Sequence, residues 1–250
     1  MSRPASYRFT VLRKLAVTPH MLRVTLGGEG MTRFPADQAS AYVKLLLHPG
    51  QGGDRPLLRT YTVRAQRADS IDIDFVVHGD EGGPASRWAM QAQAGDVIEI
   101  SGPGPKKLAD PTADWLLLVG DMTALPAISV NLEQLPDTAR GRAVIEVPDV
   151  ADVQPLQAPP EFAVQWVINP SPGTTDAALR DEVAALEWPP GPVSVWAACE
   201  FSSMRALRRH FREERGLDRK QLYISSYWKL GSDETSHKAI KREDAERDTA

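Results

Sequence analysis

The stretch Trp115-Leu-Leu-Leu-Val-Gly120 decides how this 250-residue chain is expected to fold. It is a continuous apolar run, which is typical of a strand that a parallel sheet buries on both faces. A helical pattern follows at 123–135, and strands and helices then alternate toward the C-terminus. Further strands are expected at 143–147, 162–168, 193–198 and 221–225, and further helices at 174–187 and 202–215. Such alternation predicts a parallel-sheet α/β domain.

The first part of the chain has a different pattern. Its β-rich runs are short, are separated by turn residues, and lie at 7–15, 21–26, 42–48, 71–77 and 96–101. One helix is expected from about Pro84 to Gln91. Short strands at this spacing favour a small antiparallel barrel. The predicted fold class is therefore an N-terminal antiparallel β-barrel followed by a C-terminal parallel-sheet α/β domain.

The turn-rich segment Gly102-Pro-Gly-Pro-Lys-Lys107 lies between the two patterns. We therefore predict a barrel domain at 1–108 and an α/β domain at 109–235. The remaining residues, 236–250, are charged and carry no apolar period, so a mobile tail is expected there.

Composition excludes several classes of protein. With 42% hydrophobic and 25% charged residues, the chain is expected to be globular and to bury a core. Cys199 is its one cysteine, so a single chain builds no disulfide, thiolate zinc site or iron–sulfur cluster. A net charge of −4 argues against a general nucleic-acid binder. The apolar runs are far shorter than the roughly 20 residues of a membrane span, and without a secretory signal the expected compartment is the cytoplasm.

Two segments of the barrel half combine residues that suit a flavin nucleotide. Arg59-Thr-Tyr-Thr62 places a guanidinium, an aromatic ring and hydroxyls on one strand, where they can bind a phosphate, stack a planar ring and hydrogen-bond a ring nitrogen. Gly82-Gly-Pro-Ala-Ser86 opens a helix, whose backbone N–H groups suit a diphosphate. A plain edge strand is the alternative interpretation of the first segment. The chain contains no G-x-G-x-x-G, Walker or H-E-x-x-H motif, and its five histidines lack metal-ligand spacing.

Five motifs, in order, resemble those of the siderophore-interacting proteins, which are FAD-containing ferric-siderophore reductases of the ferredoxin–NADP reductase superfamily. The resemblance covers about residues 5–240. Its motifs are Arg59-Thr-Tyr-Thr62, the block from His78-Gly to Trp88-Ala, Gly95-Asp-Val-Ile-Glu-Ile-Ser-Gly-Pro-Gly104, Gly120-Asp-Met-Thr-Ala-Leu-Pro-Ala-Ile128 and Tyr227-Trp-Lys-Leu-Gly231. The resemblance implies an FAD-binding barrel followed by a domain that binds NADPH or NADH.

The resemblance also implies which residues hold the FAD. Arg59 would meet the phosphates, Tyr61 would stack on the isoalloxazine ring, and Thr62 would lie near its reactive edge. His78 and Trp228 also match the family, although ordinary packing is an alternative for each. The full set of implied FAD residues is Arg59, Thr60, Tyr61, Thr62, His78, Gly83, Pro84, Ala85, Ser86 and Trp228.

The implied nicotinamide nucleotide site lies at the ends of the α/β strands. Its residues are Gly120, Asp121, Thr123, Ala124 and Glu200. Thr123 is expected to cap the helix that follows Gly120 and to meet a phosphate, while a plain N-cap is the alternative. Cys199 stands where the family usually has glycine. An arginine within 204–220 would favour NADPH, whereas Glu146 or Asp149 holding a ribose diol would favour NADH.

Three basic residues are candidates for binding an anionic ferric siderophore, because an acidic chain needs a local positive pocket to attract it. They are Lys44, Arg64 and Lys229, and a solvated edge charge is the alternative for each. The predicted activity passes electrons from NAD(P)H through FAD to chelated Fe(III) and releases Fe(II), with no catalytic acid or base required. The sequence leaves open a reductase whose electron partner is a protein such as ferredoxin, and a non-catalytic siderophore- or flavin-binding protein.

Overall fold

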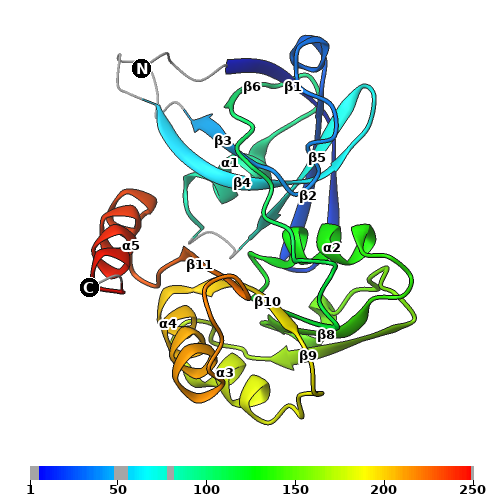
Figure 1. The fold of residues 1–250 in the computed structure, drawn as a ribbon. Helices are drawn as coiled ribbons and strands as arrows, with labels where there is room; N and C mark the ends of the chain where they lie inside the picture. The colour runs from blue at the N-terminus through cyan, green and yellow to red at the C-terminus, as the bar shows by residue number, and fades with distance from the viewer. Residues whose placement is uncertain (1–5, 48–55, 78–81, 249–250) are drawn as a thin grey trace. The chain divides into compact units, whose positions relative to one another are not determined.

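The computed structural model describes residues 6–47, 56–77 and 82–248 (Figure 1). The chain divides into two compact units, Met1–Lys107 and Leu108–Ala250. Within the described ranges no helix is long and apolar enough to cross a membrane.

The first unit is a closed antiparallel barrel with the strand order β1-β2-β5-β4-β3-β6. Its strands are β1 (Ser6–Thr18), β2 (Met21–Gly27), β3 (Tyr42–Leu47), β4 (Leu57–Gln66), β5 (Ser70–Val76) and β6 (Val97–Ser101). A short 3-10 helix, η1 (Glu29–Thr32), follows β2, and α1 (Pro84–Gln91) packs on β2, β3 and β5. The predicted antiparallel barrel is confirmed.

Alternation along the strands fills the barrel interior. Phe9, Ile73 and Ile100 are fully buried, and they come from β1, β5 and β6. On the other face of β5, Asp72 is also buried, and its pKa is set by two opposing effects. Burial raises this pKa, but hydrogen bonds from Arg67 and Thr25 outweigh burial and lower it. The barrel therefore carries a stabilising polar pairing outside its apolar core.

The second unit is a five-stranded parallel sheet with the order β11-β10-β7-β8-β9. Its strands are β7 (Trp115–Asp121), β8 (Arg140–Val147), β9 (Glu161–Ile168), β10 (Val193–Glu200) and β11 (Leu222–Trp228). Its helices are α2 (Leu125–Gln134), α3 (Ala177–Ala184), α4 (Phe201–Arg209) and α5 (Glu234–Asp248). A 3-10 turn, η2 (Val150–Asp152), follows β8, and a π-helical turn, η3 (His210–Glu214), extends α4.

Different helices pack on the two faces of this sheet. Val119 and Ala197 face α3 and α4, which lie side by side and contribute Leu179, Val183, Met204 and Leu207 to the same apolar cluster (Figure 1). Gly120 faces α2 instead. The predicted parallel α/β sheet is confirmed.

The predicted tail is wrong, because residues 234–248 form the helix α5. His237 is the one buried residue of α5, so the helix lacks the apolar stripe by which sequence patterns reveal helices. Ion pairs hold it instead: Arg208 Nη1 lies 2.7 Å from Asp244 Oδ2, and Arg212 Nη1 lies 2.5 Å from Asp248 Oδ2. Apolar periodicity in the sequence does not predict a helix that is held mainly by ion pairs.

Candidate functional site

The strand β4 turns Arg59 and Tyr61 to one face and Thr60 and Thr62 to the other. Arg59 pairs with Leu45 and Tyr61 pairs with Val43 on β3, so both share the face of these buried side chains. The half-buried Arg59 donates Nη1–H to the Leu58 carbonyl at 2.9 Å. It has no carboxylate partner in the described part of the chain, which is compatible with its predicted place beside the FAD phosphates.

A chain of aromatic rings joins the two segments that the sequence singled out. The ring centroid of Tyr61 lies 4.5 Å from that of Phe75, which lies 5.7 Å from that of Trp88 on α1. Phe75 is fully buried, so the core fixes the plane of the half-buried Tyr61 ring. Sequence patterns did not point to Phe75, because its place in an alternating strand indicates only a core residue.

The start of α1 has several features that fit an anion. Gly83 is the N-cap residue and offers no side-chain cap, while a Cβ built on it would meet no described residue within 4 Å. Ser86 is only 6% exposed, and its Oγ has no hydrogen-bond partner among the described residues. Pro84 and the buried Ala85 complete the turn, which carries no acidic residue. Free N–H groups, an unpaired buried hydroxyl and open space fit the diphosphate of an FAD. His78 lies outside the described residues.

The candidate substrate residue Lys44 lies on the face of β3 opposite to Val43 and Leu45. Strand register places Lys44 between Thr60 of β4 and Ser101 of β6, and Thr62 faces Tyr42 on the same side. The half-exposed ammonium has no ion-pair partner within 6–47, 56–77 and 82–248. The structure thus groups Lys44 with hydroxyl side chains, whereas Arg64 lies beyond Thr62 at a register irregularity of β4.

At the carboxyl end of β7, Gly120 is required by close packing. A Cβ there would lie 2.7 Å from the Ala198 carbonyl oxygen, 2.8 Å from Ala124 Cβ and 2.8 Å from Ile128 Cδ1. The glycine therefore lets α2 and β10 approach β7, whatever the edge binds.

The buried carboxylate of Asp121 accepts four hydrogen bonds at this edge. Oδ1 accepts from Thr123 N at 2.9 Å and from Thr123 Oγ1 at 2.5 Å. Oδ2 accepts from Glu200 N at 2.8 Å and from Trp228 Nε1 at 2.7 Å. The expectation that Thr123 caps the helix is wrong, because its hydroxyl bonds to Asp121 and the N-cap residue of α2 is Ala124. An aspartate followed two residues later by threonine is the sequence signal for this local turn.

Glu200 is likewise engaged within the protein. Its side chain caps α4 by accepting from the N–H groups of Ser202 and Ser203, and Oε1 accepts from Leu230 N at 3.2 Å. The edge residues Asp121 and Glu200 therefore tie together the ends of β7, β10 and β11. Their oxygens shape the backbone at the predicted nucleotide site rather than standing free to receive a ligand.

Three carboxylates lie buried close to one another. Asp121, Glu146 and Glu200 are 3%, 4% and 2% exposed. Burial raises the pKa of Glu146 to about 7, and the charges of Asp121 and Glu200 act in the same direction. Burial also raises the pKa of Asp121, despite its hydrogen bonds. The alternative that Glu146 holds a ribose diol is not supported, since its side chain is buried.

The remaining candidates of the second unit lie near this edge. The half-buried Trp228 has its indole fixed by Asp121, and Lys229 Nζ lies 5.2 Å from the centre of the Phe201 ring. Cys199 is fully buried, and burial raises the pKa of its thiol well above the ordinary value, which disfavours a reactive thiolate.

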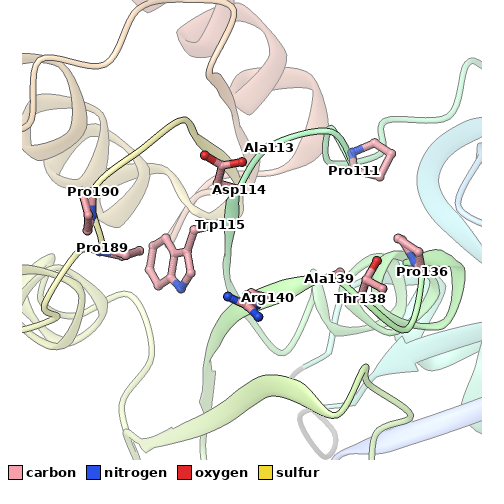
Figure 2. A pocket seen from close by; sticks show the side chains of 10 residues that line it. All are labelled: Pro111, Ala113, Asp114, Trp115, Pro136, Thr138, Ala139, Arg140, Pro189 and Pro190. Carbon is pink, nitrogen blue, oxygen red and sulfur yellow. The ribbon is translucent and has the colours of Figure 1, made fainter.

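A hollow of about 570 Å³ lies at the other end of the sheet, where β7 and β8 begin (Figure 2). Trp115 and Arg140 project toward it, between Pro136 on one side and Pro189 and Pro190 on the other. No predicted site residue lines this hollow, and we assign no function to it.

Comparisons with known proteins identify the family of this chain. Residues 10–55 and 50–107 match the model of the siderophore-interacting FAD-binding domain, and residues 113–231 match that of the siderophore-interacting protein. The ferric vibriobactin reductase ViuB of Vibrio cholerae is 37% identical over 247 residues, which cover 90% of each chain. This chain belongs to the siderophore-interacting protein family.

Two further relatives extend the comparison. The crystal structure of the siderophore-interacting protein SipS from Aeromonas hydrophila is 35% identical, has a TM-score of 0.87, and matches over 97% of this chain and 99% of that one. The NADPH-dependent ferric-chelate reductase of Escherichia coli is 27% identical over 239 residues, which cover 88% of this chain and 91% of that protein. The predicted family, fold class and oxidoreductase class are confirmed, with an FAD-binding first unit. The roles of single site residues remain predictions.

Replacing Asp121 tests its role at the strand ends. In Asp121→Asn, the new amide N–H₂ faces donors that it cannot accept from, so we expect the free energy of unfolding to fall by about 2–3 kcal/mol. Asp110→Asn is the matched control, because exposed Asp110 makes the same turn with Thr112 N and Oγ1 at 3.0 and 2.7 Å. Urea unfolding followed by tryptophan fluorescence measures both variants. Equal losses in the two would contradict the assignment.

The raised pKa of Glu146 makes a prediction about pH. The folded chain keeps a proton on Glu146 up to about pH 7, whereas the unfolded chain releases it near the ordinary value of 4.5. Stability should therefore fall as pH rises from 5 to 8, by up to about 3 kcal/mol. Glu146→Gln should flatten this fall, which urea unfolding at several pH values would detect. The same pH slope in wild type and variant would show that Glu146 titrates normally.

Proposed function

We propose that this protein is an FAD-dependent reductase of ferric siderophores, which takes electrons from NADPH or NADH and releases the metal as Fe(II). The observation that carries the proposal is the start of α1, where the buried Ser86 hydroxyl has no partner, and Gly83 no close neighbour, among the residues that the structure describes. This helix lies within the part of the chain that matches an FAD-binding domain of siderophore-interacting proteins. Two relatives are named as a ferric vibriobactin reductase and a ferric-chelate reductase.

The chain's own residues would bind and orient the cofactor. Arg59 brings a positive charge that no carboxylate of the described chain neutralises, and α1 brings backbone donors and the Ser86 hydroxyl. Tyr61 presents a ring whose plane is fixed by Phe75, so it can stack on a planar ring without first being ordered. When bound, FAD supplies the conversion between a two-electron hydride donor and a one-electron metal acceptor.

Lys44 is the substrate contact that the geometry supports best. Its ammonium, which pairs with no carboxylate of the described residues, stands beside the hydroxyl residues Thr60 and Ser101, on the same face as Thr62. Many ferric siderophores are anionic and rich in oxygen atoms, which such a group of donors can bind. Arg64 and Lys229 are proposed as further positive groups for the same substrate.

The nicotinamide nucleotide is proposed to bind at the carboxyl edge of the parallel sheet. Gly120 and Ala124 let α2 approach the strands closely, and Asp121, Thr123 and Glu200 fix the backbone through hydrogen bonds. That Trp228 forms a wall of the cofactor site remains a prediction. The predicted compartment remains the cytoplasm.

The proposed activity is tested by comparing three electron donors. The purified protein, reconstituted with FAD, is given NADPH, NADH or reduced ferredoxin together with a ferric siderophore, and Fe(II) is trapped by a coloured chelator. We expect a visible flavin spectrum and Fe(II) formation with a nicotinamide nucleotide. Fastest reduction by ferredoxin would favour the protein-partner alternative. A protein that binds FAD and ferric siderophore but forms no Fe(II) with any donor would be a carrier, and one that takes up no FAD would contradict the proposal.

Substitutions at the proposed FAD site should weaken FAD binding. Removing a charged hydrogen-bond donor costs roughly 1.5–3 kcal/mol, so Arg59→Ala should raise the Kd for FAD about tenfold or more. Ser86→Ala should raise it severalfold. Isothermal titration with FAD measures both, and Arg33→Ala, which changes an exposed arginine of the same unit, is the control. Unchanged affinity in both variants would remove these residues from the site.

Lys44→Ala should raise the apparent KM for an anionic ferric siderophore severalfold and leave FAD content unchanged, because Lys44 and Arg59 point to opposite faces of their strands. Lys44→Arg, which keeps the charge, should restore most of the loss. Lys106→Ala is the control, since Lys106 Nζ pairs with Asp37 at 2.7 Å. Loss of FAD in Lys44→Ala, or an unchanged KM, would show that Lys44 is not a substrate contact.

A further inference from the structure

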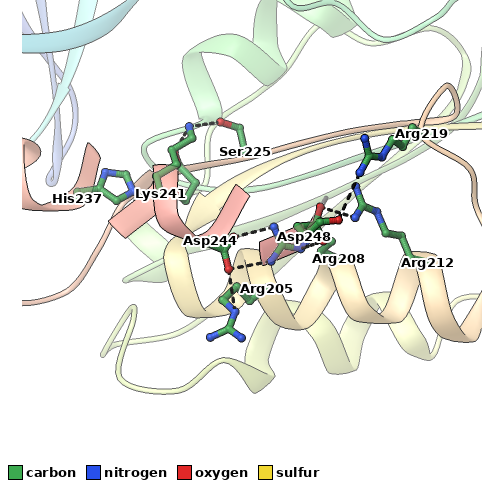
Figure 3. A network of polar contacts seen from close by, with 10 residues as sticks. Arg205, Arg208, Arg212, Arg219, Ser225, His237, Lys241, Asp244 and Asp248 are labelled. Atoms are coloured by element: carbon green, nitrogen blue, oxygen red, sulfur yellow. Dashed lines mark hydrogen bonds and ion pairs between the residues drawn. The ribbon is translucent and has the colours of Figure 1, made fainter. Parts of the chain in front are cut away.

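The helix α5 contacts the rest of the second unit mainly through charges (Figure 3). Asp244 accepts from Arg208 Nη1 and Nη2 at 2.7 and 3.0 Å, and its Oδ1 lies 3.2 Å from Arg205 Nε. Asp248 pairs with Arg212 at 2.5 Å and with Arg208 Nε at 3.4 Å. The two aspartates are four residues apart, so they lie one helical turn from each other and face α4 together.

The positive charges at this contact outnumber the negative ones. Arg205, Arg208, Arg212 and Arg219, which we call the arginine row, meet two carboxylates and the Asp248 carbonyl oxygen, which accepts from Arg219 Nη2 at 3.3 Å. The arginine row therefore keeps a positive surplus while α5 is bound. Arg205 is 61% exposed, so the row also continues to the surface.

The other contacts of α5 include polar groups that water would solvate better. Ile240 packs only partly buried against the apolar cluster, and His237 Nε2 lies 2.7 Å from Ser226 Oγ. Lys241 Nζ donates to Ser225 Oγ at 2.7 Å and to the Ser226 carbonyl oxygen at 3.0 Å. Burial lowers the pKa of Lys241, because these neutral oxygens replace water without supplying a negative charge.

We propose that the arginine row is a docking surface for an acidic protein segment, and that α5 is its resident occupant, which such a segment displaces. The chemistry that fits is a helix carrying two carboxylates at positions i and i+4, as Asp244 and Asp248 do. Paired guanidinium groups bind carboxylates with two parallel hydrogen bonds, which makes the row selective for this arrangement. The contact is largely ionic, so its strength falls with added salt.

Tethering explains why α5 occupies the row in the isolated chain. A segment joined by the short link between β11 and α5 has a high effective concentration, so weak contacts suffice to hold it. A separate partner must overcome this advantage through extra contacts or by meeting the surplus charge at Arg205. In the isolated chain α5 therefore covers the arginine row, and a partner with more negative charge than α5 displaces it.

The test uses full-length protein and, as the probe, a fluorescent peptide with the sequence of residues 234–250. The test protein is Asp244→Asn/Asp248→Asn, which weakens the internal contact. As the control, Glu243→Gln/Glu246→Gln removes the same charge from two exposed side chains of α5, one of which, Glu246, pairs with Arg242 of the same helix. Fluorescence anisotropy should show that the peptide binds the test protein about tenfold or more tightly than wild type or control. Adding salt, or Arg208→Gln/Arg212→Gln in the test protein, should abolish the gain.

Several outcomes would overturn the proposal. The first is that the peptide binds the test protein no more tightly than wild type, or binds neither. The second is that a peptide carrying Asp244→Asn and Asp248→Asn binds the test protein as tightly as the unchanged peptide. The third is that a single-stranded DNA oligonucleotide binds the test protein more tightly than the peptide does. This third result would mean that the arginine row binds phosphate groups rather than carboxylates. If the test protein does not fold, amide hydrogen exchange in the wild-type protein tests the proposal instead. The amides of α5 should exchange faster as the salt concentration is raised. An exchange rate that does not change with salt would contradict an ionic contact from which α5 can be displaced.

Discussion

The carboxylate of Asp121 is the interaction on which the predicted nucleotide edge depends. It is 3% exposed and accepts from Thr123, from the backbone of Glu200 and from the indole of Trp228, so one side chain holds the ends of β7, β10 and β11. Burying a carboxylate is costly, and these donors offset only part of that cost, since burial still raises the pKa of Asp121. The position of Glu200, and through it the start of α4, follows from this single group.

The two units differ in the sign of the charged groups at their candidate sites and in how those groups are paired. In the first, no described residue neutralises the charges of Arg59 and Lys44 or bonds to the Ser86 hydroxyl, which supports the proposal that this unit binds anions. In the second, the negative groups Asp121 and Glu200 are satisfied internally, and Glu146 has its pKa raised toward neutrality. This division suits electron transfer, in which the protein positions a cofactor and a substrate and needs no catalytic acid or base.

The fold was predictable because its signals are local. The apolar run at 115–120 and the alternation in β5 mark a buried strand and a barrel strand without knowledge of their neighbours. The sequence offers the candidate site as a set of motifs but not as a network, since Asp121 and Trp228 are 107 residues apart and their hydrogen bond exists only in the folded sheet. Thr123 is a different case, because its partner Asp121 lies only two residues before it and an Asp-x-Thr turn competes locally with a helix cap. The helix α5 escaped prediction because Arg208 and Asp244, 36 residues apart, hold it instead of an apolar stripe.

The central claim is that electrons pass through FAD bound by the first unit to iron held in a siderophore. The most direct measurement is a single-turnover experiment without oxygen, in which the FAD-loaded protein is reduced by NADPH or NADH, separated from excess nucleotide, and mixed with a ferric siderophore. The account predicts that the visible flavin band returns at the same rate as Fe(II) appears in a trapping chelator. A flavin band that stays bleached while the ferric complex remains intact would contradict it.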